Sequence, residues 1–117
     1  MHFEVLKKRS QFLEMRHKGE TFPSPSFLVS MYKGGEGVNV GYIVTKKLGN
    51  AVIRNKSKRR MRAVMDKLIR LNDNFSVPEG TSGLTLVLIG RKFSIDRPFE
   101  KMVQETKKIL QEQGCTF

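Results

Sequence analysis

The stretch LTLVLIG, at positions 84–90, is an almost continuous apolar run. It is far shorter than the roughly 18 apolar residues that a membrane-spanning helix needs. A short run of this kind is typical of a β-strand that is covered on both of its faces. The run therefore predicts a sheet with helices packed against it.

The rest of the chain contains segments with the periodicity of helices and strands. The expected elements are a short helix over 10–19, a weak strand over 20–23, strands over 27–32 and 40–46, a long helix over about 51–71 and an amphipathic helix within 94–114. Ser10 and Asn50 are candidate N-caps of the first two helices. The glycine-rich segment KGGEGVN is suited to join two strands as a hairpin. This order predicts the α+β class, and the length of 117 residues predicts a single domain over 1–117.

Composition restricts the class of protein further. Apolar residues make up 38% of the chain, which is too many for a disordered protein. The single cysteine, Cys115, leaves no disulfide framework and no cysteine spacing typical of zinc sites. The N-terminal segment MHFEVLKKRSQF carries charges where a signal peptide needs its apolar stretch. We therefore expect an intracellular, cytoplasmic protein that has no membrane partner.

The positive charge of the chain is concentrated in one segment. The formal net charge is +11, and the segment TKKLGNAVIRNKSKRRMR, residues 45–62, has eight Lys or Arg among its 18 residues and no acidic residue. A solvated surface normally mixes charges of both signs, whereas a purely basic segment attracts polyanions. This segment therefore favours a nucleic-acid partner over a surface that is basic only for solubility.

The long helix that follows Asn50 divides into two halves. Met61, Val64, Met65 and Leu68 form an apolar stripe that is expected to pack on the sheet, but Arg54 and Ser57 interrupt this stripe toward the N-terminus. Asn55, Lys58, Arg59 and Arg62 lie on one flank, and Lys56 and Arg60 lie on the other. Repulsion between these cations and the positive helix N-terminus is unfavourable, so a polyphosphate partner is expected to offset it. The basic half is expected to project past the core.

This segment resembles the signature of the bacterial ribonuclease P protein component family, which reads Lys-Lys-x-Gly-Asn-Ala-Val-x-Arg-Asn-Arg-x-x-Arg-x-x-Arg. The corresponding residues are Lys46, Lys47, Gly49, Asn50, Ala51, Val52, Arg54, Asn55, Lys56 in place of the third residue of Arg-Asn-Arg, Arg59 and Arg62, with Lys58 and Arg60 alongside. The segments LKKRSQF, SPSFLV and LVLIGRK extend the resemblance over about 100 residues in the order that the family has.

The resemblance implies the element order αβββαβα, with a left-handed β-α-β crossover around the basic helix. It also implies that the chain is the protein subunit of an RNA-based endoribonuclease, which removes the 5′ leader from precursor tRNA. In this family a large RNA is the catalyst. The chain would therefore carry no catalytic residue, no metal site and no small-molecule substrate, and Mg²⁺ would be held mainly by the ribonuclease P RNA.

The resemblance also implies the roles of particular residues. The side chains that would face the catalytic RNA are those of Lys46, Lys47, Arg54, Asn55, Lys56, Lys58, Arg59 and Arg62, with the first two at a strand end. Phe12, Arg16 and Tyr32 would line the cleft for the leader of precursor tRNA. The family often has aromatic residues at the positions of Arg16 and Ser30. Tyr32, two residues beyond Ser30, is expected to face the same side of its strand.

Three other functions are alternatives for a small basic protein of this composition. An independent protein nuclease would need paired carboxylates or a histidine with an acid, but the acidic residues are scattered and His2 and His17 are isolated. Composition alone is compatible with a ribosomal or RNA-chaperone-like protein, although such a protein does not need the Gly-Asn-Ala-Val and Arg-Asn spacing. A membrane-surface helix is disfavoured, because the short apolar stripe of the basic helix is needed for the core.

Overall fold

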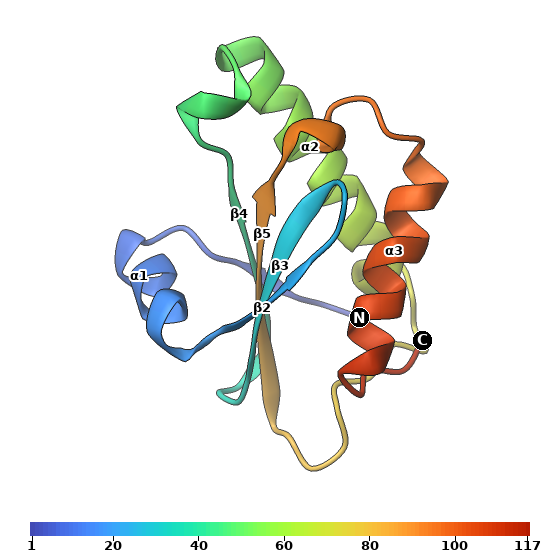
Figure 1. Cartoon of the computed structure of the whole chain (residues 1–117). Helices are drawn as coiled ribbons and strands as arrows, with labels where there is room; N and C mark the ends of the chain where they lie inside the picture. The colour runs from blue at the N-terminus through green and yellow to red at the C-terminus, as the bar shows by residue number, and fades with distance from the viewer.

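A five-stranded sheet with the strand order β1-β4-β5-β3-β2 organises the fold, in a computed structural model that describes residues 1–117. The elements are β1 (Glu4–Val5), α1 (Arg9–Lys18), β2 (Glu20–Pro23), β3 (Phe27–Lys33), β4 (Gly37–Ile43), the 3₁₀ turn η1 (Lys46–Leu48), α2 (Ala51–Met65), the π-helical segment η2 (Asp66–Arg70), β5 (Gly83–Gly90), the 3₁₀ turn η3 (Lys92–Ser94) and α3 (Phe99–Glu112). Figure 1 shows the sheet nearly edge-on, with α1 on one face and α2 and α3 on the other. The predicted order αβββαβα and the α+β class are confirmed, and the short strand β1 is an addition.

The apolar run of the sequence is the central strand β5. It pairs with β3 in antiparallel fashion and with β4 in parallel fashion. Leu84, Leu86 and Leu88 are fully buried, and Val87, between them, is buried in the small cluster that packs against α1. The expectation that this strand is covered on both faces is therefore confirmed.

The prediction of a hairpin between the strands over 27–32 and 40–46 is wrong. β3 and β4 do not pair with each other, because β5 lies between them and pairs with both. The glycine-rich connection instead passes over the beginning of β5, where a Cβ atom on Gly83 would lie 2.7 Å from the carbonyl oxygen of Gly35. The backbone groups of a buried strand need hydrogen-bond partners along both of its edges. β5 therefore lies between β3 and β4 and keeps them apart.

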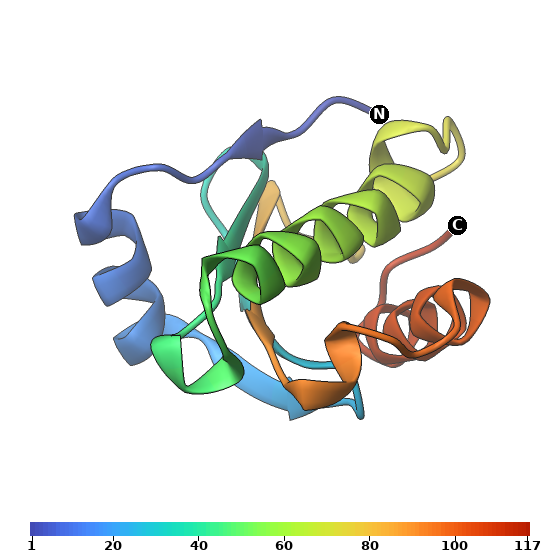
Figure 2. The same cartoon turned by 90° about the horizontal axis from the view of Figure 1, so that it is seen from above.

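The connection from β4 through α2 to β5 is a crossover between neighbouring parallel strands. In Figure 2, β4 and β5 run toward the viewer, and the chain passes from β4 to α2 and on to β5 in a clockwise sense. The crossover is therefore left-handed, as the family resemblance implies and against the usual right-handed rule.

Of the two predicted helix N-caps, one is confirmed and one is wrong. Asn50 is the N-cap of α2, because its Oδ1 accepts a hydrogen bond from the backbone N–H of Ile53 at 3.0 Å. The expected N-cap Ser10 is wrong, since α1 begins at Arg9. At this end Gln11 Oε1 accepts from the backbone N–H groups of Lys7 and Lys8, at 3.2 and 3.0 Å. A glutamine side chain thus reaches back to the two residues before the helix, where a serine cap was expected.

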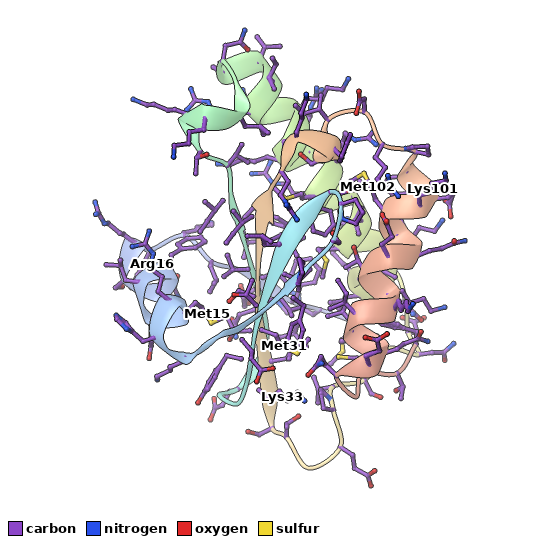
Figure 3. All side chains as sticks on the ribbon, viewed as in Figure 1. Met15, Arg16, Met31, Lys33, Lys101 and Met102 are labelled. Atoms are coloured by element: carbon purple, nitrogen blue, oxygen red, sulfur yellow. The ribbon has the colours of Figure 1, made fainter.

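The core has two parts, one on each face of the sheet. The larger part lies between the sheet and the helices α2 and α3, and the smaller part consists of Leu6, Met15 and Val87 under α1. Figure 3 shows Met15 and Met31 on opposite sides of the sheet, and Met102 on the side of α3 that faces α2. None of the helices has the length and apolar character needed to span a membrane.

Candidate nucleic-acid interface

The N-terminal turns of α2 extend past the end of the sheet together with η1, as Figure 1 shows. Ser57, which the helical wheel marks as a poor core residue, is fully buried at the point where α2 meets β5. The residue opposite is Gly90, and a Cβ atom there would lie 2.6 Å from Ser57 Oγ. Two small residues therefore let the basic helix approach the sheet closely.

The basic side chains of α2 remain free of acidic partners. Asn55, Lys56, Arg59 and Arg62 are exposed, and Arg54 and Lys58 are half-buried. None of these cations is in an ion pair. Arg62 lies over the ring of Tyr42, with 5.9 Å between the guanidinium carbon and the ring centroid. The resulting surface is one of uncompensated positive charge.

Arg54 has a donor without an acceptor. Its Nε atom is buried and has no hydrogen-bond partner. The side chain lines a hollow of about 230 Å³ together with Asn55 and Lys58. Leaving a buried charged donor without an acceptor is costly, on the order of 1–3 kcal/mol or more. A phosphate oxygen in this hollow would satisfy the donor.

Lys46 and Lys47 lie in η1, beyond the strand end where they were expected, because β4 ends at Ile43. Gly49 follows them with a φ of 154°, and a Cβ atom there would lie 3.0 Å from the side chain of Ile53. Glycine at this position therefore allows the sharp turn from η1 into α2. Both lysines are exposed.

A second basic segment lies beside η1. Lys47 lines a hollow of about 430 Å³ with Arg91 and Lys92, which follow the end of β5. The parallel strands β4 and β5 end on the same side, and this brings the two segments together. Arg91 and Lys92 were not among the predicted site residues. The signal that points to them is a basic pair directly after the apolar run.

The predicted cleft lies between α1 and the sheet. Phe12 and Arg16 line a hollow of about 310 Å³, with Ser30 and Thr45 among the other residues. Phe12 is half-buried and packs against β4 at Gly41, where a Cβ atom would lie 2.6 Å from the Phe12 ring. Phe12 is thus part of the packing under α1 and also part of the wall of the cleft.

Tyr32 lies apart from Phe12 and Arg16. It faces the same side of β3 as Ser30, as expected, but it lines a separate hollow of about 290 Å³ on the other flank of α1. Met15 lines both hollows and lies between them. The Lys18 ammonium group lies 5.5 Å from the Tyr32 ring centroid and is paired with Glu14 at 2.6 Å. Only two of the three predicted cleft residues are therefore brought together.

The fold and these surfaces define a small α+β protein that binds nucleic acid. No group of three or more His, Cys, Asp or Glu side chains is placed so that it could hold a metal ion.

Comparison with known proteins gives the family. The model of the family described as Ribonuclease P matches residues 2–114. The chain is 34% identical over 111 residues to the ribonuclease P protein component of Gluconacetobacter diazotrophicus, covering 93% of this chain and 90% of that protein. It is 35% identical over 102 residues to the corresponding protein of Erythrobacter litoralis, with coverages of 86% and 78%. The chain therefore belongs to the ribonuclease P protein family, and it is the protein component of an endoribonuclease whose partner is ribonuclease P RNA.

Solved structures agree with this assignment. The ribonuclease P protein of Thermotoga maritima superposes with a TM-score of 0.73 at 27% identity, covering 93% of this chain and 96% of that one. A Staphylococcus aureus ribonuclease P protein structure has the same fold, with a TM-score of 0.70 at 23% identity and coverages of 93% and 94%.

Proposed function

We propose that residues 1–117 act in the cytoplasm as one RNA-binding domain with two working surfaces. The basic half of α2 and the turn η1 bind ribonuclease P RNA. The cleft under α1 holds the 5′ leader of precursor tRNA while the RNA removes that leader. This chain contributes binding and orientation, and it contributes no catalytic residue.

The observation that carries this proposal is the continuity of the two surfaces. Thr45 lines the hollow under α1 and also the hollow that contains Lys47, Arg91 and Lys92. The cleft that contains Phe12 therefore opens directly onto the basic surface. A single strand could lie in the cleft while its phosphates, and those of the catalytic RNA, meet cations at the opening.

The residues assigned to the catalytic RNA are Lys46, Lys47, Arg54, Asn55, Lys56, Lys58, Arg59 and Arg62. Arginine can grip a phosphate through two parallel N–H donors, and lysine acts as a compact charge. Arg54 supports this assignment in particular, because its buried Nε lacks an acceptor that a phosphate would supply. Lys56, where the family signature has Arg, supplies charge without the fork-shaped set of donors.

The residues of this chain do not fit a magnesium site, because no cluster of metal-binding side chains is present. No step of the reaction is therefore assigned to a metal that the protein holds. We propose that Mg²⁺ is held mainly by the RNA partner, whose phosphate oxygens are ligands that this ion prefers.

The test is cleavage of a precursor tRNA at low magnesium concentration. The reaction contains a bacterial ribonuclease P RNA with the protein, the RNA alone, or the protein alone. We expect faster cleavage only when both are present, because the protein cations reduce the repulsion between two RNA molecules. Cleavage by the protein alone would contradict the proposal. Equal rates with and without a folded protein that is paired with its cognate RNA would favour the ribosomal or chaperone-like alternative.

Replacing Phe12 with alanine tests the cleft. If Phe12 stacks on a leader nucleotide, Phe12→Ala should weaken binding of precursor tRNA to the assembled enzyme by about 1–3 kcal/mol and leave binding of mature tRNA almost unchanged. The measurement is the pair of dissociation constants, with circular dichroism as a check of folding. Leu13→Ala is the matched control, because Leu13 is the next apolar residue of α1 and is 42% exposed. Equal losses for the two tRNAs would show that Phe12 only packs.

A further inference from the structure

Arg60 differs from every other basic residue of the segment 45–62. It is the only one whose side chain forms hydrogen bonds within the protein. Its Nε donates to the carbonyl oxygen of Ser94 at 2.8 Å, and its Nη2 donates to the carbonyl oxygen of Arg97. Nη2 also lies 3.2 Å from the sulfur of Met102 in α3. The guanidinium group therefore spans the connection between β5 and α3.

Hydroxyl groups hold the same connection at a second point. Ser57, one turn before Arg60, has its Oγ 2.7 Å from Ser94 Oγ, and both side chains are fully buried. The Ser94 hydroxyl also donates to the carbonyl oxygen of Arg91 at 2.6 Å. The chain of contacts thus runs from α2 through η3 to Arg91, the residue that follows the end of β5.

The far end of the connection is held as well. Arg97 donates to Glu105 of α3 through Nε and Nη2, at 2.8 and 2.9 Å. Its backbone N–H donates to the carbonyl oxygen of Phe93 at 3.1 Å. The segment 91–97 therefore contacts both α2 and α3. Arg60 is the residue of α2 that donates to the carbonyl groups of Ser94 and Arg97.

The held segment begins with Arg91 and Lys92, which are exposed and share a hollow with Lys47. Arg91 also has contacts of its own, since its backbone N–H donates to the carbonyl oxygen of Ser26 at 3.0 Å and its Nη1 to that of Ser24 at 3.1 Å. The contacts that Arg60 makes therefore bear most on the position of Lys92 relative to α2. A surface binds a polyanion more tightly when its cations are already held in place, because fewer side chains have to be ordered on binding.

We propose that Arg60 is a positioning residue of the RNA interface. It does not bind phosphate itself. It fixes Lys92, next to Arg91, beside the basic half of α2, so that both segments meet the RNA as one rigid surface. This inference rests on the proposed function, and it concerns the residue next to Arg59, which we assign to the RNA.

The two adjacent arginines give matched variants. Each phosphate contact adds about −0.7 to −0.9 to the slope of log affinity against log salt concentration. Arg59→Ala should therefore make that slope shallower by roughly this amount. Arg60→Ala should weaken the binding of ribonuclease P RNA about tenfold and leave the slope unchanged, because the number of phosphate contacts stays the same.

Conservative variants separate charge from geometry. A lysine keeps the charge at position 60, but its ammonium group cannot span the two carbonyl oxygens as the planar guanidinium does. We expect Arg60→Lys to weaken RNA binding nearly as much as Arg60→Ala, and Arg59→Lys to weaken it by no more than about threefold. Because Arg60→Lys keeps the charge and most of the side chain, it carries the test if Arg60→Ala does not fold.

A double-mutant cycle with Lys92→Ala supplies the decisive comparison. If Arg60 acts by placing Lys92, Arg60→Lys should cost less RNA affinity in the Lys92→Ala background than in the wild type. On a logarithmic scale the loss of affinity should fall to about half or less. The loss caused by Arg59→Ala should be the same in both backgrounds. Melting temperatures of all variants identify any general loss of stability.

Three results would overturn the inference: wild-type affinity of Arg60→Lys, a salt slope of Arg60→Ala that is as shallow as that of Arg59→Ala, or full additivity of Arg60→Lys with Lys92→Ala. Each of these results counts against the inference when Arg59→Ala lowers the affinity and the salt slope as expected, because α2 is then the RNA-binding surface. If that assignment fails instead, Arg59→Ala itself leaves both the affinity and the salt slope unchanged.

Discussion

Replacing Arg59 and Arg62 together with alanine is expected to lower the affinity for ribonuclease P RNA by about ten- to a hundredfold at low salt. Both side chains are exposed on α2, and neither is neutralised by an acid. If the wild-type protein neutralises about six phosphates, its slope of log affinity against log salt concentration is on the order of −5. The variant should have a clearly shallower slope, which fluorescence anisotropy measures over a series of salt concentrations.

A control must separate the effect of the total charge of the protein from the effect of where on its surface the charges lie. Lys101→Ala with Lys108→Ala removes the same formal charge from exposed positions of α3. Figure 3 shows Lys101 on the outer side of that helix, away from the sheet. This control should change the slope far less. An equal effect of the two double variants would mean that the RNA senses only the net charge of the protein.

The second large effect is expected on stability. Leu86 is fully buried in the central strand β5 and contacts the main core. Leu86→Ala should reduce the free energy of unfolding by about 2–5 kcal/mol, because it removes buried methyl groups and leaves a cavity between rigid elements. Urea denaturation followed by circular dichroism measures this loss.

Leu71→Ala makes the same chemical change where Leu71 is 72% exposed, after the end of η2. It should change the free energy of unfolding by no more than about 0.5 kcal/mol. A similar small effect of Leu86→Ala would mean that β5 does not organise the core. The comparison therefore tests the position of this strand in the sheet.

The features that could be predicted from the sequence are those that depend on near neighbours. The N-cap Asn50 bonds to Ile53, three residues away, and the apolar run over 84–90 marks a buried strand by itself. The concentration of cations in 45–62 is likewise a property of one segment. Helix periods, caps and charge runs extend over only a few residues, so a linear reading detects them.

The family signature added what local patterns do not contain. The left-handed crossover breaks a general rule, and only the resemblance implied it. The roles of the RNA-facing residues also came from the resemblance, and they stay predictions until the variants above are measured.

Only the tertiary structure decided which segments meet. It placed β5 between β3 and β4, where the sequence predicted a hairpin. It also separated Tyr32 from Phe12, since Met15 of α1 lies between their hollows.

The same holds for the two adjacent arginines of α2. Arg59 and Arg60 have the same chemistry in the sequence, but one faces solvent and the other holds two carbonyl groups more than 30 residues away. Their difference depends on partners that are distant in sequence, because strand pairing and packing bring those partners close only after the whole chain has folded. The sequence alone therefore determined the class of the protein and its charge, and the fold determined which of those charges remain free to bind RNA.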